Sequence, residues 1–335
     1  MKVAVGLSGG VDSAVAALLL AEEGHEVVGV TMTLGRPSDA AAVGDAQAVA
    51  DRLGIPLATF DLSAAWRRNV LAYIRDTYLS GRTPNPCIRC NESVKFGLLP
   101  QAAFDRLGCD RFATGHYARL VRDGAGGVRL LRGVDRAKDQ SYFLYRIRPD
   151  VLARTLFPLG GRTKAEVRAL ARAAGFASAD RHDSQDFCGG DPMQIVGAAD
   201  REGEVVTLDG EVIGRHRGFW HYTVGMRKGL GIGGGTPYYV LSVDRNANRI
   251  VVGTRNEAIR TEFRMRPMNW MAAEPTEGKI EGFVKIRSNG SPVGPATLEN
   301  GIVRVPNGIF GVAPGQSAVM YSASGAILCG GVIQG

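Results

Sequence analysis

The segment that most restricts how this chain folds lies at its amino terminus. An apolar run, Lys2–Gly6, leads into Gly6-Leu7-Ser8-Gly9-Gly10-Val11-Asp12-Ser13, and a helical pattern of apolar residues occupies 12–22. Adjacent glycines allow backbone N–H groups to form a concave nest, and the hydroxyls of Ser8 and Ser13 add further donors. Because the positive end of the helix dipole points at this nest, the segment predicts a phosphate-binding loop between a strand and a helix.

Strands and helices continue to alternate through the first half of the chain. β-Branched runs predict strands at 26–32, 56–60 and 111–114, and apolar periodicity predicts helices at 46–53, 64–79 and 93–107. Such alternation is typical of parallel strands joined by crossover helices. The expected fold class is therefore α/β, with a doubly wound parallel sheet in the N-terminal domain and β-rich domains after it.

The pattern changes further along the chain. Residues 150–200 are mainly helical, since Thr163 and Glu166 form a capping-box pair ahead of an apolar run that ends at Gly175. After Asp200, Asn-Gly and Asp-Gly pairs separate short Val- and Ile-rich runs, which is typical of antiparallel hairpins. We expect three domains, at residues 1–200, at 201–268 (small and β-rich) and at 269–335 (similar to a β-barrel).

Charge is distributed unevenly along the sequence. Residues 1–63 carry 3 basic and 8 acidic side chains, a net charge of −5, whereas residues 64–335 carry 37 and 25, a net charge of +12. This distribution fits a polyanion held by the later parts of the chain, or an ordinary basic protein without such a partner. No run reaches the roughly 18 apolar residues of a membrane span, and the amino terminus lacks a secretory pattern, so we expect no membrane association.

Two of the five cysteines lie three residues apart. Cys87 and Cys90 occur in Thr83-Pro84-Asn85-Pro86-Cys87-Ile88-Arg89-Cys90-Asn91, which predicts a loop stiffened by proline. Arg89 and Lys95 are expected to favour the thiolate, the reactive form of cysteine. Zinc is an alternative for this pair, but no fourth ligand with suitable spacing is evident. So few cysteines exclude a disulfide framework, and the reducing cytoplasm is the expected compartment.

The other three cysteines have different surroundings. Cys188 lies in a polar loop bounded by glycine, Asp183-Ser184-Gln185-Asp186-Phe187-Cys188-Gly189-Gly190. Cys109 follows an amphipathic helix and Cys329 lies in an apolar run, so both are expected to pack as small hydrophobic residues. The sequence therefore points to Cys87, Cys90 and Cys188 as the cysteines available for chemistry.

The first loop resembles a known phosphate-binding element. Ser8-Gly9-Gly10-Val11-Asp12-Ser13 is not a Walker A loop, because no Gly-Lys-Ser/Thr follows. It resembles the PP-loop of enzymes that split ATP between its α and β phosphates in order to adenylate a substrate oxygen. That resemblance implies an adenine nucleotide α-hydrolase-like domain, and it makes Asp12 the expected contact to Mg²⁺ and pyrophosphate.

Six motifs in order extend the resemblance along the chain. They are SGGVDS, TPNPCIRCN, ATGHYA, KDQSYFL, DSQDFC and HYTVGMRKGLGIGG, and the similarity continues to Pro314-Gly315-Gln316. This order resembles that of the tRNA-specific 2-thiouridylases. The resemblance implies a tRNA-uridine 2-sulfurtransferase that uses ATP and Mg²⁺ to replace O2 of the wobble uridine with sulfur, releasing AMP and pyrophosphate.

Family motifs assign roles to individual positions. By resemblance, ATP contacts Gly6, Leu7, Ser8, Gly9, Gly10, Val11, Asp12, Ser13, Met32 and Gly115. The implied tRNA contacts are Asn85, Pro86, Cys87, His116, Lys138, Asp139, Gln140, Arg287, Ser288 and Gln316, together with the helical segment 150–200. Cys188 carries the sulfur as a persulfide, and Cys90 is the nucleophile that releases it and closes a transient disulfide with Cys188.

Two positions depart from the family pattern, and three other functions stay open. Cys87 replaces a common aspartate, and Arg287-Ser288-Asn289 replaces an Arg-Tyr-Arg run. Cys87, Cys90 and Cys188 suit a [4Fe–4S] cluster that binds free sulfide, without a persulfide relay. An amide or guanidine synthetase would use the loop without the cysteines, and a tRNA-binding protein would use neither.

We expect the protein to be a monomer. Its expected partners are tRNA and either a sulfur-donor protein or sulfide.

Overall fold

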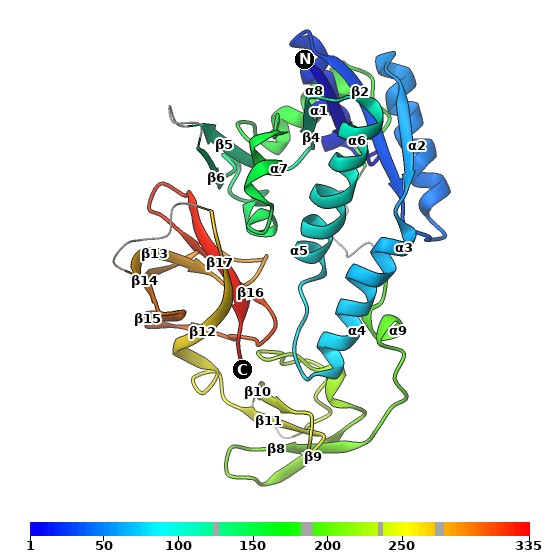
Figure 1. Ribbon diagram of the computed structural model, residues 1–335. Coiled ribbons are helices and arrows are strands. Elements are labelled where there is room, and N and C mark those ends of the chain that lie inside the picture. Colours follow the sequence, from blue (N-terminus) through cyan, green and yellow to red (C-terminus); the bar gives the residue numbers. More distant parts are fainter. Residues whose placement is uncertain (123–126, 182–189, 234–236, 272–277) are drawn as a thin grey trace. The chain divides into compact units, whose positions relative to one another are not determined.

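The computed structural model describes residues 1–122, 127–181, 190–233, 237–271 and 278–335 (Figure 1). They form two compact units. The first comprises Met1–Val70, Cys87–Cys188 and Gly325–Ile327, and the second comprises Leu71–Pro86, Gly189–Ser324 and Leu328–Gly335. Within the described ranges, no helix combines the length and the apolar character needed to cross a membrane.

A five-stranded parallel sheet forms the centre of the first unit. Its strands lie in the order β3-β2-β1-β4-β7 (Figure 1). They are β1 (Lys2–Gly6), β2 (Glu26–Thr33), β3 (Leu57–Asp61), β4 (Arg111–Ala113) and β7 (Thr155–Leu156). All neighbours pair in parallel. The predicted doubly wound α/β fold is confirmed.

Helices cover both faces of this sheet. Val3 and Val5 of β1 pack in one apolar cluster with α1 (Val11–Glu22), α2 (Asp39–Leu53) and α8 (Lys164–Ala173). Ala4 is fully buried on the opposite face, where α6 (Leu99–Leu107) contacts β2 and β4. Because side chains alternate between the faces of a strand, the uninterrupted run Val3-Ala4-Val5 fits a strand buried on both sides.

The two long helices expected at 64–79 and 93–107 are each interrupted by a wide π-helical turn. The first consists of α3 (Ser63–Trp66), η1 (Arg67–Leu71) and α4 (Ala72–Leu79). The second begins earlier than expected, with α5 (Pro86–Cys90) and η2 (Asn91–Leu98) before α6. In η2 a Cβ on Gly97 would lie 2.9 Å from the carbonyl oxygen of Glu92, so the glycine permits this close approach.

The cysteine pair lies on helix α5, so the expectation of a proline-stiffened loop is wrong for Cys87 and Cys90. Pro86 is the first residue of that helix. Proline suits this position because its missing N–H needs no acceptor there and its fixed φ is already helical. A proline next to two cysteines therefore starts a helix here, where the sequence analysis took it to stiffen a loop.

Shorter elements complete the first unit. They are β5 (Ala118–Arg122), β6 (Val128–Arg132), the 3-10 turn η3 (Ser141–Leu144) and α7 (Pro149–Ala153). Strands β5 and β6 form an antiparallel pair. Their hairpin follows the sheet strand β4 and leads towards the region that contains α7 and α8.

The second unit is rich in β structure, as predicted. Four strands lie in the order β10-β11-β8-β9: β8 (Gly203–Val206), β9 (Val212–His216), β10 (Tyr239–Asp244) and β11 (Arg249–Gly253). The 3-10 turn η4 (Phe219–His221) and helix α9 (Pro192–Val196) pack with α4 beside them. Phe219, Trp220 and Val196 are the buried centre of this packing.

Six further strands close into a barrel. Their order is β12-β15-β14-β13-β16-β17, with β12 (Ile259–Trp270), β13 (Lys279–Lys285), β14 (Val293–Glu299), β15 (Ile302–Phe310), β16 (Ser317–Tyr321) and β17 (Ile327–Ile333). Val303 and Val305 point into its core, in keeping with the alternation of a strand. The domain limits at 200 and 268 stay predictions.

Candidate functional site

The loop after β1 is held by its own serine hydroxyls. Ser8 N–H donates to Ser13 Oγ at 3.2 Å, and Ser13 Oγ donates to the carbonyl of Gly10 at 3.0 Å. Gly9 has a φ of +75°, a conformation that favours glycine. The N-cap residue Gly10 offers no side chain to the first N–H groups of α1, so these have no intrahelical acceptor. The loop is therefore a preformed set of donors for an anion.

The loop lies where the order of the strands reverses. Strands β2 and β3 extend the sheet on one side of β1, and β4 and β7 extend it on the other. In doubly wound sheets, ligands bind at this switch point, beyond the carboxyl ends of the strands. Gly115 follows β4 and approaches the backbone of Asp12 so closely that a Cβ there would lie 2.6 Å from the carbonyl carbon of Asp12. Met32, near the end of β2, is half-buried at the same edge.

Asp12 forms an ion pair that the sequence analysis did not expect. Lys164 Nζ lies 2.8 Å from Oδ1 and 2.9 Å from Oδ2 of Asp12. The hydroxyl of Tyr117 donates to Oδ1 at 2.8 Å. The Lys164 side chain is only 10% exposed, and that of Asp12 is 32% exposed. Both carboxylate oxygens of Asp12 are thus engaged by one ammonium group.

This pairing does not fit a magnesium ion bound to Asp12. Mg²⁺ requires oxygen ligands in near-octahedral geometry, and a second cation on the same carboxylate would be repelled by the Lys164 ammonium. Asp45, which contacts the loop at Gly9, is itself paired with Arg181 at 2.7 Å. Across the described ranges, no group of three His, Cys, Asp or Glu side chains could hold a metal ion.

Cys90 is buried and Cys87 is partly exposed on α5. The Nη1 atom of Arg89 pairs with Glu92 Oε2 at 3.0 Å, and its Nε donates to the carbonyl of Asn69 at 3.1 Å. Glu92 also accepts from Arg146 at 2.8 Å. One carboxylate thus serves two guanidinium groups, and the cluster of Arg89, Glu92 and Arg146 keeps a net charge of +1. The effect that Arg89 was expected to have on the Cys90 thiol stays a prediction.

Cys188, predicted to carry the persulfide, lies outside the described residues. The disulfide predicted between Cys90 and Cys188 and the third ligand of the alternative [4Fe–4S] cluster therefore lie outside them as well.

The two remaining cysteines, Cys109 and Cys329, are packed in the interior. Cys109 is 3% exposed and Cys329 is fully buried. Burial raises the pKa of Cys109 and raises that of Cys329 to about 12. Both thiols therefore stay protonated and unreactive, as expected for packed cysteines.

Of the implied tRNA contacts in the first unit, His116 lies in an aromatic setting. Its ring centroid is 5.5 Å from that of Phe96 and 6.1 Å from that of Phe157, and Nδ1 lies 2.8 Å from Thr114 Oγ1. Desolvation, and then the charge of Lys95, lower the pKa of His116 to about 3. His116 is therefore a neutral imidazole at physiological pH.

The segment Lys138-Asp139-Gln140 is tied to its own surroundings. Asp139 is buried, and its carboxylate accepts from Arg132 Nε at 2.9 Å and from the N–H groups of Gly133 and Ser141 at 3.1 and 3.2 Å. Gln140 Oε1 accepts from the N–H of Tyr117 at 3.0 Å. Gln140 thereby holds the backbone of Tyr117, whose hydroxyl reaches Asp12, whereas Asp139 holds the backbone of its own segment. Lys138 beside them is half-buried.

In the second unit, the chain ahead of the cysteines is anchored to the barrel. Gln316 Nε2 donates to the carbonyl of Pro84 at 2.6 Å, and Thr83 N–H donates to the carbonyl of Pro314 at 2.8 Å. Gly315, with φ +91°, lets the two segments approach, since a Cβ there would lie 2.7 Å from the oxygen of Thr83. Asn85, which is buried, donates its N–H to the Tyr73 hydroxyl at 3.1 Å. These bonds set the position of residues 83–86 immediately before α5.

Arg287 also has internal partners. Its Nη2 donates to the carbonyls of Gly311 and Val224 at 2.7 and 3.1 Å, and its guanidinium lies 5.9 Å from the centroid of the Phe310 ring. Ser288 next to it is half-buried. Arg287 therefore joins the barrel to the segment after η4, whatever further contact it makes.

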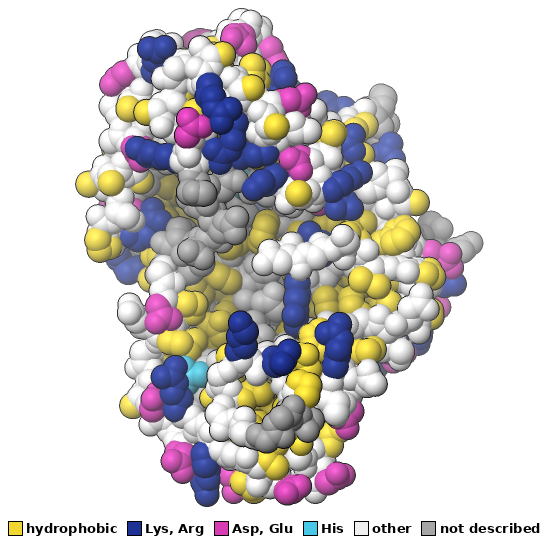
Figure 2. Space-filling model, turned by 180° about the vertical axis from the view of Figure 1, so that it is seen from behind, with side chains coloured by type: hydrophobic (Ala, Val, Ile, Leu, Met, Phe, Trp, Pro, Cys, Tyr) yellow, Lys and Arg dark blue, Asp and Glu magenta, His cyan; other side chains and the backbone are white. Residues whose placement is uncertain are grey.

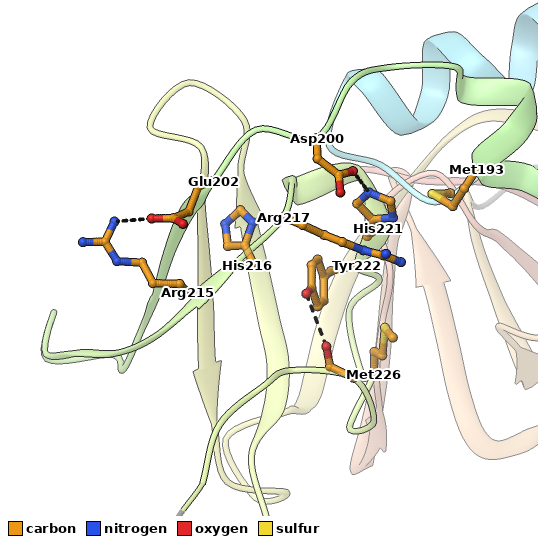
Figure 3. Close-up of a pocket in the computed structure, with 10 residues that line it drawn as sticks. Met193, Asp200, Glu202, Arg215, His216, Arg217, His221, Tyr222 and Met226 are labelled. Carbon is orange, nitrogen blue, oxygen red and sulfur yellow. Dashed lines mark hydrogen bonds and ion pairs between the residues drawn. The ribbon is translucent and has the colours of Figure 1, made fainter.

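A separate pocket of about 720 Å³ lies in the second unit (Figure 3). Its charged side chains are largely paired with one another: Asp200 with His221 at 3.2 Å, and Glu202 with Arg215 at 3.3 Å. Burial lowers the pKa of His216, which keeps this histidine neutral. Four residues of the motif HYTVGMRKGLGIGG line the pocket, namely His221, Tyr222, Met226 and Gly229, but none of the residues to which the resemblance assigned a role does, and the balanced charges favour no particular ligand.

Comparison with known proteins covers nearly the whole chain. Family models match residues 1–189 (tRNA methyl transferase HUP domain), 194–254 (tRNA methyl transferase PRC-barrel domain) and 260–333 (aminomethyltransferase beta-barrel domain). The tRNA-specific 2-thiouridylase MnmA of Nostoc sp. is 42% identical over 99% of this chain and 98% of its own. That of Endomicrobium trichonymphae is 40% identical over 99% of both chains.

The chain belongs to the tRNA-specific 2-thiouridylase family. The family resemblance seen in the six motifs is thereby confirmed. Among solved structures, a 4-thiouridine synthetase in complex with RNA and ATP matches with a TM-score of 0.39 and 23% identity, over 56% of this chain and 44% of that one. So low a score supports no argument about this chain.

For this member of the family, sequence reasoning missed Lys164 and Tyr117 beside the phosphate loop. Tyr117 follows the predicted contacts Gly115 and His116 directly, and Lys164 was taken only as part of a capping box. One signal was present in the sequence. A lysine in the first turn of a helix opposes the helix dipole, so its presence there calls for a nearby anion. In this 2-thiouridylase family member, that anion is the carboxylate of Asp12 in the PP-loop.

Proposed function

We propose that this chain is an ATP-dependent enzyme that replaces O2 of a tRNA uridine, at the wobble position, with sulfur. The observation that carries the proposal is similarity over the full length to 2-thiouridylases, combined with a phosphate loop at the switch point of the sheet. Relatives named as tRNA-specific 2-thiouridylases supply the substrate class. We further propose that the enzyme works in the cytoplasm as a monomer.

The first half of the reaction activates the base. The donors of the loop from Gly6 to Ser13 bind the phosphates of ATP, while Gly115 and Met32 lie along the same edge of the sheet. The uridine O2 attacks the α phosphorus, and the bond from that phosphorus to the bridging oxygen breaks. Pyrophosphate leaves, and O2 becomes a good leaving group as part of AMP. Mg²⁺, if bound, would be carried by the phosphates of ATP and not by Asp12, and it would help to neutralise their charge.

The second half delivers sulfur. Cys188 accepts a sulfur atom as a persulfide from a donor of the persulfide class, and the terminal sulfur attacks C2 as AMP leaves. The Cys90 thiolate then attacks the Cys188 sulfur, the S–S bond breaks, and the outer sulfur stays on the base. The product is an oxidised enzyme with a disulfide between Cys90 and Cys188, and a cellular thiol reductant supplies the two electrons and two protons that restore both thiols.

Cys90→Ser tests this relay. We expect the variant to form no 2-thiouridine over repeated turnovers, because a hydroxyl cannot attack and release persulfide sulfur. Binding of ATP and tRNA should stay within about twofold of the wild type, since the side chain is buried in α5 and changes by one atom. The measurement is mass spectrometry of nucleosides from tRNA incubated with ATP and a persulfide donor. Cys188→Ser should behave in the same way.

Cys109→Ala is the matched control, because this cysteine is buried at the end of α6 and has no part in the relay. It should thiolate tRNA at the wild-type rate. Substantial turnover by Cys90→Ser would refute the relay. Absence of 2-thiouridine with the wild type and every donor supplied would refute the function itself.

A further inference from the structure

We propose that Lys164 binds the pyrophosphate part of ATP, and that Asp12 holds the Lys164 ammonium ready for it instead of binding a metal ion. The inference rests on the proposed use of ATP and assigns a residue of the phosphate site that no sequence motif indicated. Its ligand class is a polyphosphate: inorganic pyrophosphate or the β and γ phosphates of ATP.

Lys164 lies beside the start of the helix that follows the phosphate loop. It is the first residue of α8, and its ammonium reaches the first turn of α1, next to Asp12. Helix α1 begins directly after the phosphate loop, and its first N–H groups point into that loop. An anion bound by these donors therefore lies close to the Lys164 ammonium. Lysine is a common phosphate ligand because it acts as a point charge.

Burial of the Lys164 ammonium has an energetic cost. A lysine side chain that is only 10% exposed has lost most of its hydration, and a charge in that state requires compensation. Asp12 and the ring of Tyr117, whose centroid lies 5.7 Å from Nζ, supply it. A buried ion pair of this kind stabilises a fold little better than apolar side chains of the same volume. The charge is better explained by a ligand that needs it.

Asp12 has protein partners on both of its carboxylate oxygens. Its two oxygens accept from Lys164 Nζ, and Oδ1 also accepts from the Tyr117 hydroxyl, so the carboxylate is committed to protein donors. A metal ion at Asp12 would have to displace the ammonium. A polyphosphate needs no such displacement, because its oxygens can take the place of the Asp12 oxygens on the same Nζ.

This arrangement suits the bond that breaks in adenylation. When O2 of the uridine attacks the α phosphorus, negative charge gathers on the departing pyrophosphate. An ammonium that moves from Asp12 to the pyrophosphate neutralises this charge, and it returns to Asp12 when pyrophosphate leaves. Asp12 is then a positioning residue, and Lys164 is the residue that touches the ligand.

Calorimetric titration with inorganic pyrophosphate, in EDTA and again with Mg²⁺, tests the proposal. Lys164→Met should weaken pyrophosphate binding in EDTA roughly tenfold to a hundredfold, the usual loss for a charged hydrogen bond. Its AMP binding should stay unchanged. Asp12→Asn should bind pyrophosphate at least as tightly as the wild type, because the asparagine oxygen can still accept from Tyr117 but no longer competes as an anion.

Lys2→Met is the matched control. Lys2 pairs with Glu26 at 3.3 Å, at the end of β1 opposite the phosphate loop, and its loss should leave pyrophosphate binding unchanged. Three results would overturn the proposal: wild-type protein that does not bind pyrophosphate in EDTA, Lys164→Met that binds it normally, or Asp12→Asn that binds it more weakly and loses the enhancement by Mg²⁺. Should Lys164→Met not fold, Asp12→Asn decides alone.

These outcomes are separable from a failure of the proposed function. Wild-type protein that forms 2-thiouridine from ATP while Lys164→Met binds pyrophosphate normally would refute only the role of Lys164. Wild-type protein that binds pyrophosphate through Lys164 but forms no 2-thiouridine would refute only the thiolation.

Discussion

At the scale of single residues, His116 shows how packing sets a protonation state. The rings of Phe96 and Phe157 surround its imidazole, and Lys95 adds a positive charge nearby. Both effects disfavour a second proton, so the pKa falls from 6.5 to about 3. A neutral histidine can present a donor or an acceptor to another group, but it adds no positive charge.

This pKa predicts a dependence of stability on pH. Between pH 6.5 and pH 3, the unfolded chain takes up a proton at position 116 that the folded chain does not. The contribution of His116 to stability is therefore fully present above pH 6.5 and is lost as the pH falls towards 3. His116→Asn should flatten the dependence of the unfolding free energy on pH, by up to about 1.4 kcal/mol per pH unit between pH 6 and pH 4.

Urea denaturation at a series of pH values measures this effect. His216, whose pKa is also lowered by burial, continues to contribute in the variant, so some dependence on acid should stay. Identical pH profiles for the wild type and His116→Asn would show that His116 is protonated in the folded protein in the ordinary way.

Residue types predicted the phosphate loop well, because glycine, serine and a helix start act over a few neighbouring positions. They could not predict the Asp12–Lys164 pair, since 152 positions separate the partners and only the packing of α8 against α1 joins them. The same holds for Asp139, which the motif presents as a tRNA contact but whose carboxylate has three internal donors.

At the scale of elements, the segment before α5 depends on the barrel. Gln316 and Pro314 reach residues 83–84 through three hydrogen bonds, and the Thr83 hydroxyl donates to that of Thr223 at 3.1 Å. The candidate cysteines follow directly on α5. Gln316, implied as a tRNA contact by resemblance, is therefore also a positioning residue for this segment.

Gln316→Glu separates the two roles. The carboxylate cannot donate to the Pro84 carbonyl, so we expect a loss of about 1–3 kcal/mol of stability. The rate of thiolation should fall by roughly tenfold while the affinity for tRNA changes by less than about threefold. Denaturation, single-turnover kinetics and tRNA binding measure the three quantities.

Gln334 provides the control, because its Nε2 also donates to backbone carbonyls, those of Arg266 at 2.7 Å and Val332 at 2.8 Å. Gln334→Glu should lose comparable stability without a change in the rate of thiolation. A large fall in tRNA affinity for Gln316→Glu, with an unchanged rate at saturating tRNA, would instead assign Gln316 to the RNA surface alone.

Sequence periodicity predicted four strands of the parallel sheet closely, but it missed β7 within a region expected to be helical, and it missed the interruptions of the helices. A π-helical turn adds one residue to a turn. Nothing in 67–71 marks it, and in 91–98 the one signal is Gly97, whose role shows only when its close approach to the Glu92 carbonyl is known. The closing of the barrel was also beyond prediction as a strand order, because β12 pairs with β15 and β17 across long intervals of sequence.

At the scale of the whole molecule, the uneven distribution of charge along the chain matches the two ligands proposed, ATP and tRNA. The segment 1–63, with its net charge of −5, includes the phosphate loop, whose donors are mostly backbone N–H groups and hydroxyls. The remaining 272 residues carry the net charge of +12. Lys and Arg side chains are exposed over the face seen in Figure 2. Such a distribution suits a small nucleotide bound by fixed dipoles and a large polyanion bound by side-chain charge.

Salt dependence of tRNA binding tests this division. The logarithm of affinity should fall linearly with the logarithm of salt concentration, and six phosphate contacts would weaken binding about a thousandfold between 50 and 200 mM salt. Lys138→Met should reduce the slope by about one, because one phosphate contact is lost. Lys279→Met removes an exposed lysine that is already paired with Glu281 at 3.0 Å, so its slope should match the wild type.

The affinity for ATP should depend far less on salt concentration than the affinity for tRNA. ATP carries few charges compared with tRNA, and the donors of the phosphate loop are mainly neutral. A flat slope for tRNA would show that the basic residues bind no nucleic acid. Equal slopes for Lys138→Met and the wild type would remove Lys138 from the RNA surface.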